Sequence, residues 1–164
     1  MAIVFAFTFL LPCLGTGALY WFGHVSSLLL RDRAQRPIPL LLAAFSFGTA
    51  ALVLYQPQLF DVLLSQIMIG MTLAVFLTFL ISLSWKISAH GVGVGGGLGL
   101  LGMLYLTSPA SHTLWALLVM TLLAGCVLSS RLALNAHTPS QAWAGLGLGI
   151  GVVCGLSFGL WLGS

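Results

Sequence analysis

Residues 62–85 read VLLSQIMIGMTLAVFLTFLISLSW, a long and predominantly apolar stretch. It contains no Asp, Glu, Lys or Arg, and a helix needs about 20 apolar residues to cross the hydrocarbon core of a bilayer. In lipid, every backbone N–H and C=O must be paired within the chain, so a continuous apolar stretch of this length folds as a helix. The sequence therefore predicts a transmembrane helix from about Val62 to Trp85.

Five further apolar segments flank this one on both sides. They run from about Ala2 to Gly23, Ile38 to Tyr55, His90 to Leu106, Thr113 to Leu128 and Pro139 to Leu162. Charged residues make up 4% of the 164-residue chain, against roughly 25% in a soluble domain. We therefore expect an all-α integral membrane protein, a six-transmembrane-helix bundle, in which residues 1–164 form a single domain.

The scarcity of charge excludes several classes of partner. The net charge of +3 comes from five Lys and Arg residues, too few for the broad basic face that releases counterions from nucleic acid, so we expect no nucleic-acid partner. The carboxylates are Asp32 and Asp61, and two isolated carboxylates do not build a magnesium or calcium site. We expect no metal ion and no cofactor. The apolar composition indicates that the bilayer itself is a partner.

The five cations lie in three clusters, each directly before a predicted helix. Arg31, Arg33 and Arg36 are in the first connection, Lys86 is in the third and Arg131 is in the fifth. Six crossings place these three connections on one side of the membrane. Two explanations stay open: the positive-inside rule, which points to the cytoplasm, and an anion site formed where three helix N-termini meet.

Glycines recur every four residues in the last segment and crowd the start of the fourth. The periodic set is Gly147, Gly151, Gly155, Gly159 and Gly163. Such a small-residue ridge predicts close packing of a second helix against it. The cluster from Gly91 to Gly102 formally includes a dinucleotide-binding fingerprint, but no strand precedes it, so close helix packing is the interpretation we adopt.

The fifth connection holds the most specific motif. Residues 130–141 read SRLALNAHTPSQ, in which five residues separate Arg131 from His137 and three separate His137 from Gln141. A histidine near neutral pKa can act as a nucleophile or an acid, and a guanidinium fork matches the oxygens of a phosphate. Thr138 to Gln141 also reads as a capping box, so a plain helix-start role for Gln141 is the alternative.

Two shorter motifs occur in the other connections of the same side. Arg36-Pro37 closes the first, and Ser88 with His90 closes the third. Together the three motifs resemble, in order and spacing, the signatures of the type 2 phosphatidic acid phosphatase and haloperoxidase superfamily, whose membrane members hydrolyse lipid phosphates. The resemblance covers essentially the whole chain.

The resemblance implies a role for each matching residue. His137 corresponds to the nucleophile that forms a phosphohistidine, and His90 to the acid that protonates the departing oxygen. Arg36 and Arg131 correspond to phosphate clamps, with Ser88 and nearby backbone N–H groups as further phosphate contacts. The remaining cations are additional phosphate-binding candidates: Arg31, Arg33 and Lys86.

The chain departs from the signatures at three places. Leu29 stands where the first signature has lysine, and Ile87 and Ala89 replace the proline and glycine of the second. Gln141 replaces the aspartate that orients the nucleophilic histidine. A glutamine can accept a hydrogen bond from His137 Nδ1–H, but it cannot offset the charge of an imidazolium.

These features lead us to expect a metal-independent lipid phosphatase of the bacterial inner (cytoplasmic) membrane. Its substrate would be a phosphatidic acid-like lipid or a prenyl (di)phosphate. The alternatives are a catalytically weakened or non-catalytic lipid-phosphate binding or transport protein, and a structural subunit whose charges only set topology. The sequence leaves open the lipid, the oligomeric state and the side that the site faces, because members of the superfamily commonly present it outside the cytoplasm.

Overall fold

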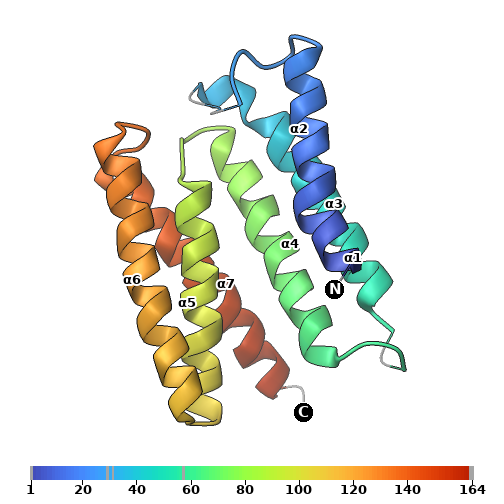
Figure 1. Cartoon of the computed structure of the whole chain (residues 1–164), viewed down its shortest axis with the longest axis vertical. Helices are drawn as coiled ribbons and strands as arrows, with labels where there is room; N and C mark the ends of the chain where they lie inside the picture. Colours follow the sequence, from blue (N-terminus) through green and yellow to red (C-terminus); the bar gives the residue numbers. More distant parts are fainter. Residues whose placement is uncertain (1, 29, 31, 57, 163–164) are drawn as a thin grey trace. The chain divides into compact units, whose positions relative to one another are not determined.

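The computed structural model describes residues 2–28, 30, 32–56 and 58–162, with the backbone alone for 158–162 (Figure 1). Within these ranges all regular elements are helices, and six helical segments are long and apolar enough to cross a membrane. The predicted all-α bundle of six spans is therefore confirmed. The chain divides into two compact units, Met1–Trp85 and Lys86–Ser164.

The first unit contains three spans. They comprise α1 (Ala2–Phe5), the π-helical turn η1 (Ala6–Leu10) and α2 (Leu11–Trp21), then the 3-10 turn η2 (Arg33–Gln35) with α3 (Pro37–Leu54), and finally α4 (Val62–Ser82). The wide π turn ends at Leu10, two residues before Pro12, which has no N–H to donate and whose ring crowds the preceding turn. One span is thus built from three helical segments that follow one another without a break.

Both carboxylates of the chain start helical turns in this unit. Asp61 precedes α4 and accepts a hydrogen bond from the Leu63 N–H at 2.7 Å, while Asp32 precedes η2 and accepts one from the Ala34 N–H at 3.1 Å. A carboxylate there satisfies an otherwise unpaired N–H and complements the positive end of the helix. The acidic residues are therefore used at helix ends.

The core of the first unit is small and lies between its three spans. Its buried members are Ala50, Ala51, Leu54 and Met68, and partly buried apolar side chains of the first span pack against them. Two serine hydroxyls tie neighbouring helices together: Ser46 Oγ donates to the Phe7 carbonyl oxygen at 2.5 Å and Ser65 Oγ to that of Leu54 at 2.6 Å. Such bonds between membrane helices average about 0.6 kcal/mol each.

The second unit contains α5 (Ala89–Thr107), α6 (Ser111–Ala133) and α7 (Pro139–Leu162). The backbones of α5 and α7 approach so closely that only glycine fits. A Cβ on Gly95 would collide with the Leu146 carbonyl oxygen, and one on Gly149 would collide with that of Val92. Lipid is as apolar as a leucine side chain, so small residues and close packing hold these helices together.

Three of the five periodic glycines on the last helix do not form the face that packs against α5. A Cβ added to Gly147, Gly151 or Gly155 would meet no atom of the described chain within 4 Å, and the side-chain positions of Gly159 and Gly163 lie outside the described residues. The packed face instead carries Ala142, Gly145 and Gly149. Spacings of three and four keep those residues on one face of a 3.6-residue helix, opposite the glycines of α5.

Helix α6 is longer than the sequence predicted. Leu128 looked like its last residue because two serines and an arginine follow, yet the helix continues to Ala133, and Arg131 lies in its last turn. Ser130 Oγ donates to the Val127 carbonyl oxygen at 2.8 Å, so the helix itself accommodates this hydroxyl. Helix α4 is shorter than predicted and ends at Ser82 instead of Trp85.

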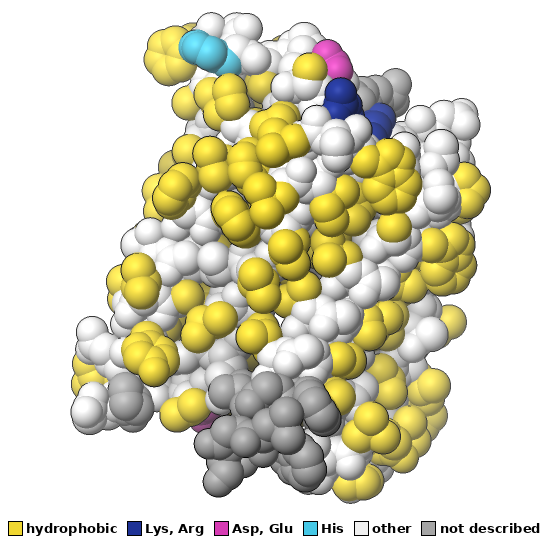
Figure 2. Space-filling model, turned by 180° about the vertical axis from the view of Figure 1, so that it is seen from behind, with side chains coloured by type: hydrophobic (Ala, Val, Ile, Leu, Met, Phe, Trp, Pro, Cys, Tyr) yellow, Lys and Arg dark blue, Asp and Glu magenta, His cyan; other side chains and the backbone are white. Residues whose placement is uncertain are grey.

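Large apolar side chains remain exposed along the spans, among them Phe45, Leu52, Leu122 and Trp115. Figure 2 shows one face on which hydrophobic side chains predominate and charged groups are few. A soluble monomer rarely exposes apolar patches of more than a few hundred Å², whereas lipid covers such a surface without cost. The protein is therefore an integral membrane protein.

We expect Gly149→Ala to lower the unfolding temperature. The added Cβ would collide with the Val92 carbonyl oxygen and lie 2.5 Å from Gly96 N, and these backbone atoms cannot move independently. Overpacking of this kind costs about 1–3 kcal/mol. Gly147→Ala is the matched control, since no described atom lies within 4 Å and alanine is the better helix former. Thermal unfolding in detergent measures both, and equal losses would contradict the contact.

Candidate functional site

The candidate residues are divided between the two units. Arg33 and Arg36 belong to the first unit, and Arg31 lies outside the described residues. The second unit contains the other six candidates: Lys86, Ser88, His90, Arg131, His137 and Gln141. The second and third motifs are thus part of the same compact unit.

The starts of α5 and α7 lie against each other in the second unit. The Ser88 N–H donates to the Gln141 carbonyl oxygen at 3.2 Å, and a Cβ on Gly91 would lie 2.8 Å from the Ala142 carbonyl oxygen. We call Ser88, Gly91, Gln141, Ala142 and Gly145 the α5–α7 junction. Both helices begin at the same end of the unit (Figure 1), so their positive dipole ends lie side by side.

Ser88 is the N-cap of α5 and is 1% exposed. Its Oγ accepts a hydrogen bond from the Gly91 N–H at 3.1 Å, which satisfies one of the free donors of the first helical turn. The preceding Ile87 is as deeply buried as Ser88. The serine of the second motif therefore fixes the position at which α5 starts, and the helix start is rigidly held in the junction.

Gln141 interacts with two neighbours through one oxygen. Its Oε1 accepts a hydrogen bond from the Thr138 N–H at 3.2 Å and lies 3.2 Å from His137 Nδ1, while its own N–H donates to Thr138 Oγ1 at 3.4 Å. The reciprocal Thr138–Gln141 pair is a capping box. The capping role and the histidine-orienting role, which the sequence offered as alternatives, are both present.

This arrangement fixes the tautomer of His137. The Thr138 N–H can only donate, so the side-chain atom that faces it must be the amide oxygen of Gln141. That oxygen can only accept, so Nδ1 of His137 carries the hydrogen of their contact. In the neutral ring the lone pair then lies on Nε2. His137 is 8% exposed, and burial on this scale limits the number of rotamers it can adopt.

Arg131 lies in the last turn of α6, directly before the chain turns back toward His137. The turn is a Schellman motif: the Ala136 N–H donates to the Arg131 carbonyl oxygen at 3.0 Å and the Asn135 N–H to that of Leu132 at 2.9 Å. Asn135 supplies the required left-handed backbone, with φ of 50°. This closure holds the backbone leading to His137 against the residue that carries the guanidinium.

The Arg131 side chain carries a donor that nothing in the described chain accepts. Its Nε is buried and has no hydrogen-bond partner among the described residues. An unsatisfied buried donor costs about 1–3 kcal/mol, more when the group is charged, and therefore requires an explanation. An anionic ligand that accepts this hydrogen bond would supply one.

His90 and Lys86 lie on either side of the α5 helix start. His90 is the second residue of α5 and is exposed, whereas Lys86 is partly buried and immediately precedes Ile87. A side chain at the helix start that remains exposed can exchange protons with water. His90 and His137 are thus in different environments, one accessible and one buried, although both belong to the ends of α5 and α7.

Arg33 and Arg36, the described cations of the first unit, both donate to backbone carbonyl oxygens. Arg36 is the N-cap of α3, is 8% exposed, and donates from Nε to the Leu30 carbonyl oxygen at 3.1 Å. Arg33 donates from Nη1 to the carbonyl oxygen of Leu83, the C-cap of α4. Arg33 thereby links the start of α3 to the end of α4, a structural role in addition to its positive charge.

Ser82 is a residue of interest that the sequence motifs did not identify. It is the last residue of α4, next to the carbonyl that Arg33 contacts, and its Oγ is buried without a hydrogen-bond partner in the described part of the chain. The sequence feature that could have identified Ser82 is its hydroxyl group between two apolar residues, Ile81 and Leu83, near the end of the predicted helix. The described chain thus has unpaired buried side-chain donors in both units, Ser82 Oγ and Arg131 Nε.

No family model matches the chain, and neither a curated protein nor a solved structure matches it. The chemistry has to be inferred from the side chains of the second unit. Helix N-termini and guanidinium groups are both groups that bind tetrahedral anions, and this unit provides two adjacent helix starts and an arginine with an unused donor. Its buried histidine has a defined tautomer and is of a type that serves as a nucleophile or a base.

Inorganic phosphate is expected to raise the unfolding temperature of the protein. A ligand that binds the folded state alone stabilises it by mass action, by about 2.7 kcal/mol at a concentration 100 times its Kd. Arg131→Met should abolish this shift because it removes the unused donor. Chloride at equal ionic strength is the control. An equal shift with chloride, or in the Arg131→Met variant, would show that no anion site exists at Arg131.

Proposed function

We propose that the protein is a metal-independent lipid phosphate phosphatase of the bacterial inner membrane. It would hydrolyse a phosphatidic acid-like lipid or a prenyl (di)phosphate through a phosphohistidine. The observation that carries this proposal is the hydrogen bond between His137 and Gln141, which follows Arg131 at the spacing of the third signature. Phosphoryl transfer depends mainly on positioning and on stabilising negative charge, and these residues provide for both.

In this proposal the phosphate group binds at the ends of α5, α6 and α7. Arg131 offers its guanidinium fork, and the first turns of α5 and α7 offer backbone N–H groups and positive dipole ends. Ser88 contributes by fixing the start of α5. Lys86, which directly precedes the start of α5 in the same unit, adds positive potential that attracts an anionic headgroup. A lipid would enter sideways from the bilayer.

The first chemical step transfers the phosphoryl group to His137. Its Nε2 lone pair attacks phosphorus, and the bond between phosphorus and the lipid oxygen breaks. His90 donates a proton to that departing oxygen. Gln141 continues to accept the Nδ1–H bond, so the ring keeps its orientation while a phosphorus–nitrogen bond forms. The products of this step are the free lipid alcohol, or the lipid monophosphate from a diphosphate, and a phosphohistidine.

The second step releases inorganic phosphate. A water molecule attacks the phosphohistidine at phosphorus, and His90, which lost its proton in the first step, accepts one from that water. The phosphorus–nitrogen bond breaks, and its electron pair returns to Nε2 of His137. Both histidines are then back in their starting protonation states, so the cycle needs no other co-reactant than water.

A second candidate function is binding or transport of a lipid phosphate without turnover. The neutral side chain of Gln141 favours it, because an amide cannot stabilise the positive charge that develops on His137 during the transfer. A protein that only binds the lipid would keep Arg131 and the starts of α5 and α7, and would still bind an anionic headgroup. Saturable headgroup binding without phosphate release from any lipid tested would identify this function.

The purified protein should release inorganic phosphate from dioleoyl phosphatidic acid or farnesyl diphosphate in detergent with a chelator present. His137→Ala should lower this rate by about 10³-fold or more, because no other group provides the attacking nitrogen. Malachite green detection measures the phosphate, and unfolding temperature verifies that the variant is folded. Equal rates in the wild type and in His137→Ala would refute the proposal.

The two roles of Gln141 can be separated by substitution. Gln141→Ala should lower kcat by roughly 10²-fold, because His137 loses the acceptor that fixes its tautomer. Gln141→Glu keeps an acceptor and adds a negative charge, so its kcat should equal or exceed that of the wild type. Thr138→Ala is the control for helix capping alone and should cost about 1 kcal/mol of stability with nearly normal kcat. A kcat in Gln141→Ala as high as in Thr138→Ala would contradict the orienting role.

A further inference from the structure

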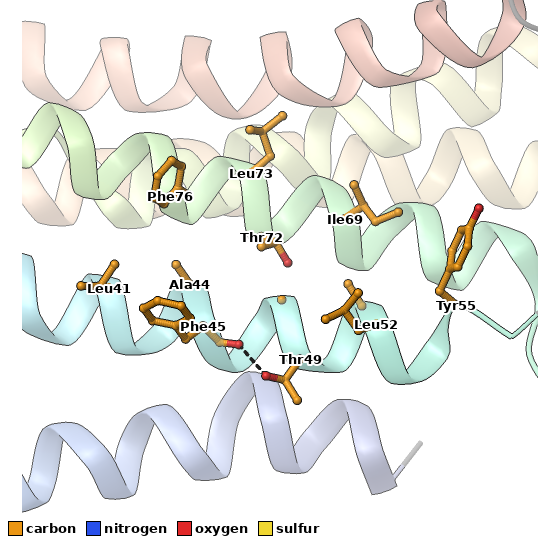
Figure 3. Close-up of a pocket in the computed structure, with 12 residues that line it drawn as sticks. Leu41, Ala44, Phe45, Thr49, Leu52, Tyr55, Ile69, Thr72, Leu73 and Phe76 are labelled. Carbon is orange, nitrogen blue, oxygen red and sulfur yellow. Dashed lines mark hydrogen bonds between the residues drawn. The ribbon is translucent and has the colours of Figure 1, made fainter.

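A groove of about 810 Å³ runs along α3 and α4 in the first unit (Figure 3). Its floor on α3 is made of the small residues Ala44, Gly48 and Ala51, which lie on one face at spacings of four and three. Larger apolar side chains form its walls: Leu41, Phe45, Leu52, Ile69, Leu73 and Phe76. Several of these wall residues are exposed, so the groove is open along its length.

The groove has the length and the position of a hydrocarbon site. Its lining extends from Leu41 to Tyr55 along α3, which at 1.5 Å per residue is about 21 Å. Both α3 and α4 belong to candidate membrane spans, and the hydrocarbon core of a bilayer is about 30 Å thick. Most of the groove therefore lies at a depth where the surrounding solvent is lipid chains.

The polar groups in the middle of the groove are already hydrogen-bonded. Thr49 Oγ1 donates to the Phe45 carbonyl oxygen at 2.9 Å (Figure 3), and Thr72 Oγ1 donates to that of Met68 at 2.8 Å. Both hydroxyls thus bond to their own helix. An occupant of this part of the groove needs no polar atoms, which favours a plain hydrocarbon chain over a polar ligand.

The two ends of the groove differ in charge. Arg36 caps the start of α3, five residues before Leu41, and Arg33 contacts the end of α4 at the same end of the unit. At the opposite end, beyond Tyr55, the nearest charged residue along the chain is Asp61 at the start of α4. This polarity fits an amphiphile whose anionic head is at the arginine end and whose chain extends toward Tyr55.

We propose that this groove binds one hydrocarbon chain of an anionic lipid whose headgroup lies at the end that carries Arg33 and Arg36. The proposal rests on the first unit alone and does not depend on the proposed phosphatase activity. The affinity for the lipid should then depend on its chain length.

Gly48→Phe fills the groove and is the variant of choice. A Cβ at Gly48 would lie 3.4 Å from Thr72 Cγ2, an ordinary contact, and Gly48 lines the groove, so a large side chain at this position takes up groove volume. Gly125→Phe is the matched control. Gly125 is an exposed residue of α6, and no described atom lies within 4 Å of a Cβ there.

The first measurement does not require turnover. Full-length protein in detergent micelles is irradiated with phosphatidic acid that carries a diazirine in the middle of one acyl chain, and labelled peptides are identified by mass spectrometry. We expect labels on α3 and α4 in the wild type and in Gly125→Phe, and at least a tenfold loss in Gly48→Phe. Equal labelling in Gly48→Phe overturns the proposal. So does labelling of the groove that disappears as the protein concentration rises, which would identify a second copy as its occupant.

The second measurement compares phosphatidic acids with long and short chains. Gly48→Phe should raise the Kd for the dioleoyl lipid at least tenfold and leave the Kd for the dihexanoyl lipid unchanged, while Gly125→Phe should change neither. If Gly48→Phe has no effect although His137→Ala abolishes phosphate release, the groove proposal fails and the proposed function stands. If no lipid releases phosphate but the groove is labelled, the groove proposal stands and the phosphatase proposal fails.

Discussion

The close approach of α5 and α7 is the constraint on which the second unit depends. Gly95 and Gly149 allow the backbones to touch, and larger residues at these positions would collide with carbonyl oxygens of the partner helix. In a bilayer no hydrophobic effect drives two apolar helices together, so the closeness of packing carries much of the association. The same contact sets the register of the helices, because Ser88 at one start hydrogen-bonds to Gln141 at the other.

The site is a product of this packing. Gln141 belongs to the junction through its backbone carbonyl and to the candidate site through its side chain, so one residue connects helix association to the orientation of His137. Membrane proteins keep ionisable groups where they are paired or functional, since burying an unpaired charge in lipid is costly. The described part of this chain follows that rule: its acidic side chains cap helical turns, and its cations lie at helix ends.

The helical spans and one contact of the candidate site were predictable from the sequence. The predictions that failed did so for physical reasons. The length of each apolar segment determined the six spans, and the spacing of His137 and Gln141 predicted their hydrogen bond. The packed face of α7 was not predictable, because two small-residue stripes occur on that helix and the partner surface selects one. Arg131 was placed in a loop because Ser129, Ser130 and Arg131 interrupt the apolar pattern, although the helix continues to Ala133. The groove depends on side-chain volumes from two helices, which no single segment reveals.

The position of Arg131 on α6 has an electrostatic consequence. Helices α5 and α7 present their positive starts at this end of the unit, whereas α6, which runs the other way, presents its negative carbonyl end. Of the three helix ends, that of α6 alone would repel an anion, and Arg131 lies in its last turn. The positive guanidinium therefore offsets the negative end of α6 beside the positive ends of α5 and α7.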